Sequence, residues 1–295
     1  MPLVDALLFA GGVPGPADPL YPLTRGQPKA LLEVAGKPMI QWVLDALGAA
    51  RTVRRVIVVG DLSPQPPSLE GKGELGVARF PPSPLQGEGV ASLTGMGVGL
   101  TCPKPLHFLP SRGSLVHNLL AGARWLAEDD PAARYGLLVS SDLPTLTPEA
   151  VDWSVEAALQ TDHDGYYSVI ARAVMEARFP DARRSYFRLK DGAYTAGDLA
   201  LLAVRLATEA HPVWQQLVEA RKNIVRQAQL IGPGLALRFI TRQLTLAEAE
   251  RRISARLGVR GRALVCPYAE AGMDVDKPHH YEIMRRELEK RSAAN

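Results

Sequence analysis

The sequence predicts an α/β fold with parallel strands flanked by helices, and three features indicate it. An apolar run over 3–10 ends at Gly11-Gly12, and a run rich in β-branched residues over 54–60 ends at Gly60. Apolar runs of this length that stop at glycine are typical of buried strands. A helical stretch over 39–49 separates them, and this order predicts a right-handed crossover between parallel strands. A third apolar strand, in the stretch over 135–144, places Asp142 at its C-terminal tip.

Composition and charge exclude several classes of protein. With 46% hydrophobic and 22% charged residues, the 295-residue chain resembles ordinary globular proteins and can bury a sizeable core. A net charge of +3 is too small to indicate nucleic-acid or membrane-surface binding. Cys102 and Cys266 match no metal-site spacing and no disulfide framework. No apolar run has the length of a membrane span, and no basic segment precedes the N-terminal run. We therefore expect a cytoplasmic protein.

The first loop has the composition of a phosphate-binding loop. Gly11 and Gly12 carry no Cβ, so their N–H groups can approach and wrap an anion. Lys29 follows, ahead of the helix over 39–49 that is expected to pack back on the strand. These parts together predict a nucleotide-phosphate site. A strand followed by two glycines is also common without such a site, and the spacing matches neither a Walker loop nor a GxGxxG motif.

Residues 63–103 differ in composition from the rest of the chain. They are dense in proline and glycine, poor in large apolar side chains, and carry a rough internal repeat, 67–73 against 82–89. Such a composition buries too little apolar surface to offset the entropy cost of ordering. We predict a disordered insertion after the second strand; a functional lid is the alternative.

Two candidate ligand sites follow the insertion. After a short strand over 105–109, Ser114 precedes a helix whose expected apolar face is Leu115, Leu119, Leu120, Ala123 and Leu126. Serine at this place is an N-cap signal, and a helix N-terminus can also bind an anion. Asp142 lies at the C-terminal tip of its strand, where open parallel sheets bind ligands. A plain cap and a plain turn residue are the respective alternatives.

The second half of the chain combines a strand, a hairpin and helices. A strand is expected over 165–172, and 186–194 reads as a hairpin with Asp191-Gly192 in its turn. The segment also holds a basic cluster, which fits either a solvated surface or a grip on an acceptor phosphate: Arg172, Arg178, Arg183, Arg184, Arg188 and Lys190. Periodic Ala/Leu segments predict a helical subdomain over 199–258, with a capping box at Thr245 and Glu248.

The C-terminal part offers a second pair of carboxylates. After a strand over 263–266, Asp274 and Asp276 stand two residues apart on an extended segment, so their side chains point the same way. Carboxylate oxygens suit a divalent cation. His279 and His280 follow, but they lack further partners at zinc-ligand spacing.

Short motifs in a fixed order resemble the nucleotidyltransferase superfamily, which includes the sugar-nucleotide pyrophosphorylases and the MobA-like NTP transferases. They are Ala10-Gly11-Gly12, Pro22-Leu23-Thr24, Pro28-Lys29-Ala30-Leu31-Leu32, Gly36-Lys37-Pro38-Met39, Ser141-Asp142-Leu143-Pro144 and Asp274-Val275-Asp276. The resemblance covers 1–60, 105–175 and 263–290. It implies a single GT-A-like (Rossmann-like) domain over 1–290, with a mixed, mostly parallel sheet flanked by helices. The insertion at 63–103 interrupts this domain, and the helical subdomain lies on the acceptor side.

The resemblance also implies a reaction and residue roles. The reaction is Mg²⁺-dependent transfer of a nucleoside monophosphate from an NTP to a small, phosphorylated acceptor, with release of pyrophosphate. Lys29 and Asp142 are the implied catalytic residues, and Asp142, Asp274 and Asp276 the implied metal ligands. Implied nucleotide contacts are Ala10, Gly11, Gly12, Arg25, Lys29, Ser114 and Asn118. Implied acceptor contacts are Arg188 and Asp198.

The chain departs from the family pattern at three places. Pro19 stands where an arginine usually contacts pyrophosphate, and we expect Arg25 to substitute for it. Asp198 replaces an asparagine, and the pair 279–280 replaces two acidic residues. Two other functions stay open. A GT-A glycosyltransferase would need an aspartate two residues before Asp142, which the chain lacks. A non-catalytic nucleotide sensor would fit the missing arginine.

Overall fold

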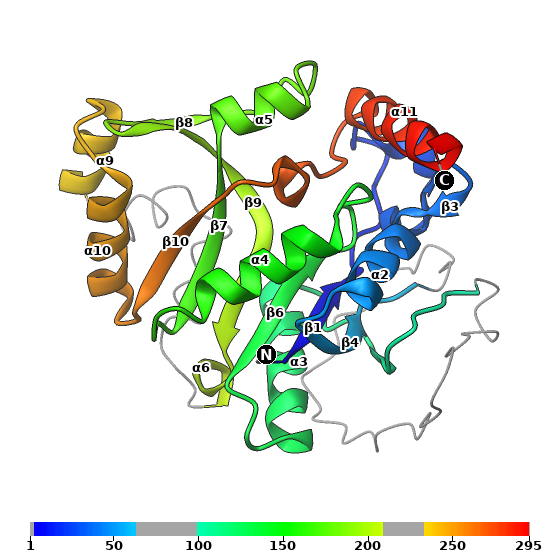
Figure 1. The fold of residues 1–295 in the computed structure, drawn as a ribbon, viewed down its shortest axis with the longest axis horizontal. Coiled ribbons are helices and arrows are strands. Elements are labelled where there is room, and N and C mark those ends of the chain that lie inside the picture. Colours follow the sequence, from blue (N-terminus) through cyan, green and yellow to red (C-terminus); the bar gives the residue numbers. More distant parts are fainter. Residues whose placement is uncertain (1–2, 63–98, 209–232, 295) are drawn as a thin grey trace.

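The computed structural model describes residues 3–62, 99–208 and 233–294. Its main feature is an eight-stranded sheet in the order β10-β7-β9-β6-β1-β4-β5, with β8 paired to β9 (Figure 1). β9 is antiparallel to both neighbours, and the other pairs along this order are parallel. The strands are β1 Val4–Phe9, β4 Val53–Val59, β5 Leu106–Leu109, β6 Tyr135–Ser140, β7 Gly165–Ala171, β8 Phe187–Leu189, β9 Gly192–Ala203 and β10 Gly261–Cys266. This confirms the predicted mixed, mostly parallel sheet.

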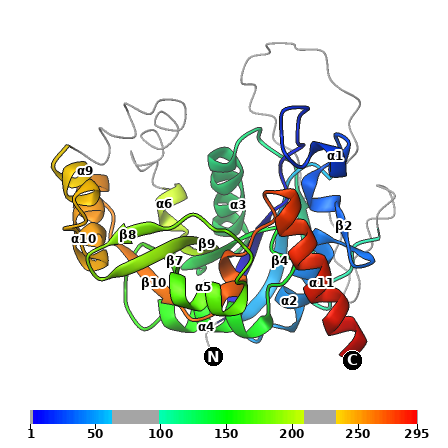
Figure 2. The same ribbon diagram turned by 90° about the horizontal axis from the view of Figure 1, so that it is seen from above.

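Helices cover both faces of the sheet, as Figure 2 shows. On one face lie α2 (Met39–Ala49) and α4 (Pro148–Ala158); on the other lie α3 (Leu115–Asp129) and α6 (Arg205–Thr208). The remaining elements are α1 Tyr21–Thr24, α5 Arg172–Arg178, α9 Pro233–Ile240, α10 Leu246–Leu257, α11 Pro278–Ala294, the 3₁₀ turns η1 Lys29–Leu31 and η3 Ala269–Gly272, and a small ribbon of β2 Glu33–Val34 with β3 Lys37–Pro38. None of the described helices is long and apolar enough to cross a membrane.

The alternation of side chains along β1 builds a core on each face. Leu8 packs into the cluster that contains α2 residues, whereas Leu7 packs with Leu126 of α3, and all three are fully buried. Successive residues of a strand point to opposite faces, so a fully apolar strand implies that both faces are covered. The predicted apolar run at the N-terminus is therefore a central strand.

Most local signals in the sequence form the predicted caps. Ser114, Thr147 and Thr245 each accept a hydrogen bond from the backbone N–H three residues on. The carboxylate of Glu248, however, bonds to Arg238 and Arg252 instead of completing the capping box. Leu115, the first residue of α3, is 58% exposed and does not belong to the apolar face of the helix.

The predicted helical subdomain over 199–258 is wrong at its start. Residues 199–203 form the end of β9, a central strand in which Leu199 pairs with Val139 of β6. Leu199, Leu201 and Ala203 are buried, and this alternation is that of a strand. Short Ala/Leu runs fit a buried strand as well as a helix, which is why the sequence pattern misled. The described helices of this region are α6, α9 and α10; residues 209–232 lie outside the described part.

The predicted disordered insertion ends earlier than residue 103. Residues 63–98 lie outside the described part of the chain. Leu100 and Cys102, in contrast, are each 1% exposed. The Gln41 side chain donates to the Thr101 carbonyl (2.8 Å) and accepts from the Thr101 N–H (2.9 Å). This paired amide satisfies both backbone groups of Thr101 much as a neighbouring strand would, and it ties the segment to α2.

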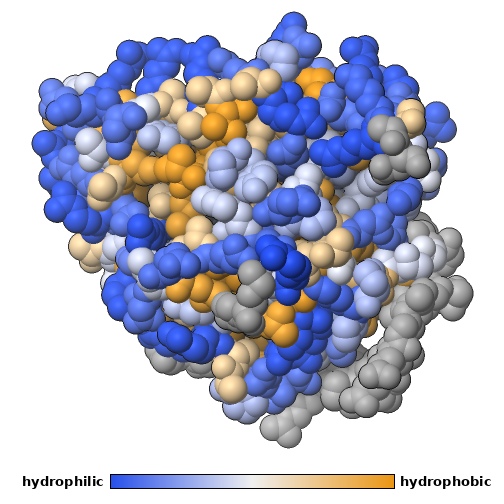
Figure 3. Space-filling view, in the orientation of Figure 1, coloured by the Kyte–Doolittle hydropathy of each residue, from blue (hydrophilic) through white to orange (hydrophobic). Residues whose placement is uncertain are grey.

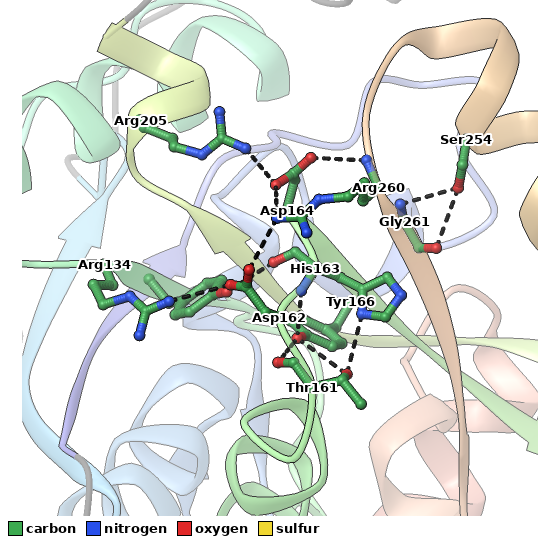
Figure 4. A network of polar contacts seen from close by, with 11 residues as sticks. Arg134, Thr161, Asp162, His163, Asp164, Tyr166, Arg205, Ser254, Arg260 and Gly261 are labelled. Carbon is green, nitrogen blue, oxygen red and sulfur yellow. Dashed lines mark hydrogen bonds and ion pairs between the residues drawn. The ribbon is translucent and has the colours of Figure 1, made fainter.

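A polar network fastens β10 to β7 at the end of the sheet that lies away from the glycine loop (Figure 4). Asp164 is 5% exposed and accepts hydrogen bonds from the backbone N–H (2.8 Å) and the guanidinium (3.3 Å) of Arg260. Arg205 also pairs with this carboxylate. One buried carboxylate thus joins the starts of β7 and β10 to the chain that follows β9.

Of the histidine pair at the start of α11 (Pro278–Ala294), His280 is buried in the core and His279 is half-buried. His280 is 2% exposed, its Nε2 lies 3.1 Å from the Ala182 carbonyl, and its Nδ1 accepts from the Asp276 N–H at 3.4 Å. Both contacts suit a neutral ring with its proton on Nε2. Burial, with the charges of His279 and Arg184, lowers the pKa of His280 to about 4.

We predict that Asp164→Ala lowers the free energy of unfolding by about 2 kcal/mol, because it removes the buried carboxylate that accepts from the Arg260 N–H and pairs with the half-exposed guanidinium groups of Arg260 and Arg205. Urea unfolding followed by circular dichroism measures this. The matched control is Asp162→Ala. Asp162 is exposed and pairs with Arg134 and Arg260 at 3.2 Å, and its loss should cost about 0.5 kcal/mol. Equal losses in the two variants would contradict the prediction.

We also predict a pH effect from His280. Because its folded pKa lies below the unfolded value, the unfolded chain takes up the proton first as the pH falls. The stability that depends on the neutral ring is therefore complete above about pH 6.5 and is lost toward the folded pKa of about 4. We expect a loss of about 2 kcal/mol between pH 7 and pH 4.5 in the wild type relative to His280→Gln, measured by urea unfolding at each pH. Parallel stability curves for the two proteins would refute this.

Candidate active site

Loops from distant parts of the chain meet at the C-terminal ends of β1 and β6. Gly11 follows β1, and Asp142 follows the adjacent parallel strand β6. Asp274 and Asp276 come after β10, at the far edge of the sheet, and the chain then returns to the centre. The Val275 N–H donates to the Asp142 carbonyl at 3.1 Å, so the two aspartate segments are joined directly through their backbones.

Lys29 lies between these segments. Its N–H donates to the Gly12 carbonyl (3.0 Å), which closes the loop and sets where the side chain starts. Its Nζ lies 2.6 Å from Asp142 Oδ2 and 2.7 Å from Asp276 Oδ1. Burial by itself would lower the pKa of Lys29, but the two carboxylates raise it above its usual range. Lys29 is therefore a permanent cation in the centre of the site.

The carboxylates of Asp142, Asp274 and Asp276 form one cluster, which we call the aspartate cluster. Each offers an oxygen, and these atoms all lie within 4.8 Å of one another. Burial and a hydrogen bond to Asp276 raise the pKa of Asp274, and the same bond, together with Lys29, lowers the pKa of Asp276. Converging carboxylate oxygens are the donor set that Mg²⁺ prefers, so these residues fit the metal that the sequence implied.

A fourth carboxylate lies beside the aspartate cluster. Asp198 is on β9, next to the residue that pairs with the end of β6. Burial, with the charges of Asp274 and Asp142, raises the pKa of Asp198 to about 8. The expected acceptor residue thus stands close to the expected metal ligands.

Two glycines let backbones pass close enough to form the site. A Cβ on Gly60 would lie 2.6 Å from the Ala10 carbonyl carbon, so this position at the end of β4 must be glycine for the loop after β1 to keep its path. A Cβ on Gly272 would lie 2.5 Å from Ile170 Cδ1 and 2.8 Å from the Ala196 carbonyl. Gly272 therefore allows η3 to cross β7 and β9 and bring Asp274 to the centre.

The start of α3 lies next to the glycine loop. Asn118 Nδ2 is 3.6 Å from where a Cβ on Gly11 would be, and Asn118 is 5% exposed. Its Oδ1 accepts from the Arg112 N–H at 2.5 Å. Ser114 Oγ accepts from the His117 N–H (3.3 Å), which confirms the cap. The structure therefore brings Asn118 to the loop, while the Ser114 side chain serves the helix.

The two arginines chosen from the sequence do not contact the aspartate cluster. Arg25 ends α1, with an exposed side chain on the same loop as Gly12. Arg188 pairs with Ala193, and Asp198 lies five residue steps further along the strand, a distance of about 16 Å. Arg184 reaches the cluster instead, with its Nη2 2.5 Å from Asp274 Oδ1. Its sequence context did not distinguish it from the other five members of the basic cluster.

A pocket elsewhere on the surface is unrelated to this site. It has a volume of about 410 Å³ and opens beside α4, where Trp153 and Tyr268 pack edge to face. Arg51 in its wall is already paired with Asp152 (3.1 Å). Figure 3 shows the molecule in the orientation of Figure 1, with hydrophobic residues gathered mainly in the left half of the view. We assign this pocket no role.

Comparisons with known proteins agree with this geometry. Residues 23–229 match the family model for the MobA-like NTP transferase domain. No curated protein matches the chain. Among solved structures, a hypothetical transferase from Thermus thermophilus is 32% identical, with a TM-score of 0.71 over 95% of this chain and 99% of that one.

More distant structures share the fold. A CMP:2-keto-3-deoxy-manno-octonic acid synthetase complexed with CTP is 13% identical, with a TM-score of 0.51 over 99% of this chain and 100% of that one. A 4-diphosphocytidyl-2C-methyl-D-erythritol synthase is 14% identical, with a TM-score of 0.52 over 98% and 99%. The fold of the chain is accordingly that of the GT-A-like nucleotidyltransferases. Because the family model matches most of its length, the chain belongs to the family of the MobA-like NTP transferase domain.

Proposed function

We propose that this protein transfers a nucleoside monophosphate from an NTP to a small anionic acceptor and releases pyrophosphate. The observation that carries the proposal is the position of Lys29, which is held between Asp142 and Asp276 beside the glycine loop. Membership of the NTP transferase family and a structural neighbour in complex with CTP support it. CTP is therefore the first nucleotide to test.

The glycine loop and Lys29 act on the nucleotide in this proposal. The N–H groups of Gly11 and Gly12, beside Ala10, face the phosphates or the base, because exposed glycines place no side chain in the way. Asn118 offers an amide at the same place. The Lys29 ammonium offsets negative charge on the α-phosphate, which grows as the acceptor oxygen attacks. Arg25, on the same loop, contacts the leaving pyrophosphate.

Asp142, Asp274 and Asp276 are the residues that would hold Mg²⁺. When bound there, the ion supplies positive charge against the phosphate oxygens of the NTP. A phosphate acceptor already carries the negative charge it needs to attack, so no side chain has to remove a proton from it. The chain's contribution is then mainly to position the two substrates and to neutralise charge.

The acceptor is assigned to the half of the site formed by β7, β8 and β9. Asp198 lies at its inner end, next to the aspartate cluster, and the hairpin that carries Arg188 extends beyond it. At a distance of about 16 Å along the strand, Arg188 suits the far end of an extended acceptor. α9 and α10 lie at the same end of the sheet as β7, β8 and β10, at the left of Figure 1.

The test is release of pyrophosphate from a panel of NTPs with Mg²⁺, in the presence and absence of sugar phosphates and other phosphorylated small molecules. Release that requires an acceptor supports nucleotidyl transfer. Tight NTP binding without release under any condition would indicate a nucleotide sensor. Transfer of sugar from a sugar nucleotide, with no pyrophosphate formed, would indicate a glycosyltransferase.

We predict that Asp142→Asn lowers kcat by about 10²–10³-fold, because a neutral amide neither holds the metal nor balances Lys29. The pyrophosphate assay measures this. Asp162→Asn is the matched control: it removes an exposed carboxylate at the other end of the sheet and should leave kcat unchanged. An Asp142→Asn enzyme of normal kcat would overturn the assignment of the site.

We predict that Arg25→Ala raises the Kd for the NTP about tenfold, the loss of one charged hydrogen bond to pyrophosphate. Calorimetric titration with the NTP measures it. Arg242→Ala provides the control, since Arg242 is likewise exposed and has a left-handed backbone (φ 54° against 50°) but lies after α9. Unchanged NTP affinity in Arg25→Ala would remove this residue from the site.

A further inference from the structure

The side chain of Arg184 has no role in the reaction as proposed so far, yet it lies against a metal ligand. Its Nη2 is 2.5 Å from Asp274 Oδ1, and its side chain is 12% exposed. Its Nε has no hydrogen-bond partner within the described part of the chain. A guanidinium carries five N–H donors, so the pair with Asp274 leaves part of its binding capacity unused.

The backbone that carries Arg184 is held firmly. The Nε2 atoms of His279 and His280 lie 3.2 and 3.1 Å from the Ala182 carbonyl. Arg183 then adopts φ 50°, in the left-handed region that arginine rarely enters. Such backbone strain persists only where the surroundings impose it. The segment thus aims Arg184 inward, toward Asp274.

Side-chain cations of the protein occupy the whole aspartate cluster. Lys29 pairs with Asp142 and Asp276, and Arg184 pairs with Asp274. A divalent cation bound to Asp274 competes with Arg184 because both require the same carboxylate and repel each other. A largely buried guanidinium that has lost its carboxylate needs another anion nearby.

The place of Arg184 along the sheet edge indicates which anion this is. Arg184 follows β7 and α5, and the neighbouring strand β9 carries Asp198. The glycine loop and Lys29 belong to the β1 side, and Asp142, after β6, stands between the two halves. Arg184 therefore faces the half that the proposed function assigns to the acceptor.

We propose that Arg184 is an acceptor-binding residue that exchanges Asp274 for an anionic group of the acceptor, a phosphate or a carboxylate, when a divalent cation binds the aspartate cluster. That the incoming anion belongs to the acceptor rests on the proposed function. The exchange of Asp274 for an anion does not rest on it. In the metal-free protein Arg184 blocks Asp274, and in the metal-bound protein it completes the acceptor site. Metal therefore binds before acceptor.

The first experiment titrates the full chain with Mn²⁺ alone, by calorimetry without nucleotide. Arg184→Gln should bind Mn²⁺ about tenfold more tightly than the wild type, because the competing cation is gone. Arg183→Gln is the matched control, since it removes the same charge one residue away from an exposed side chain, and it should bind as the wild type does. Equal Mn²⁺ affinity in Arg184→Gln and the wild type would overturn the exchange.

The second experiment uses the wild type, so it does not depend on the folding of a variant. Phenylglyoxal modifies accessible arginines, and peptide mass spectrometry reads each site. Labelling of Arg184 should rise several-fold with Mn²⁺ and fall again when an anion is added, while Arg183 should not respond. Protection by inorganic phosphate alone indicates a phosphate acceptor, and protection by acetate alone a carboxylate. Labelling that ignores Mn²⁺, or protection by neither anion, would refute the proposal.

The two proposals fail separately. An Arg184 that responds to Mn²⁺ in a protein that releases no pyrophosphate would reject nucleotidyl transfer and keep the exchange. An active transferase whose Arg184 does not respond to Mn²⁺ would reject only the exchange.

Discussion

The ion pairs of Lys29 with Asp142 and Asp276 are the contact on which the site depends. They join segments more than a hundred residues apart in the chain. A largely buried ammonium would be very costly alone, and so would each carboxylate, but together they neutralise one another. The Val275–Asp142 backbone hydrogen bond sets their spacing. These ion pairs are the side-chain contacts that link the glycine loop, the end of β6 and the chain after β10 in one site.

The sheet makes such a contact possible because its parallel strands end at one edge. β1 and β6 are neighbours, so the loops that follow them start side by side. The chain after β10 has to return across β7 and β9, and it does so only because Gly272 carries no side chain. Gly60 plays the same part beneath the glycine loop. The charged residues thus supply the chemistry of the site. Gly60 and Gly272, where a Cβ would clash, allow the backbones to approach closely enough to form it.

The balance of charge suits substrates that arrive with a metal. Asp142, Asp198, Asp274 and Asp276 face the cations of Lys29 and Arg184, so carboxylates are in excess. Burial, together with this excess of carboxylates, raises the pKa of Asp198 to about 8. A divalent cation would neutralise this excess of negative charge. Lys29 and Arg184 would then be available to phosphate oxygens. The same side chains therefore serve the empty and the loaded site in different pairings.

Features that depend on neighbouring residues could be predicted from the sequence, and features that depend on long-range packing could not. The strand before Gly11, the helix over 39–49, the caps at Ser114 and Thr147, and Asp142 at a strand tip all follow from local periodicity and short motifs. Residues 199–203 became a strand because β6 and β7 lie on either side of them. Arg184, and not Arg188, reached the aspartate cluster because the path of the chain after α5 is set by contacts with α11. Local preference is encoded in a few adjacent residues, whereas the partner of a charged side chain is decided only when distant segments pack together.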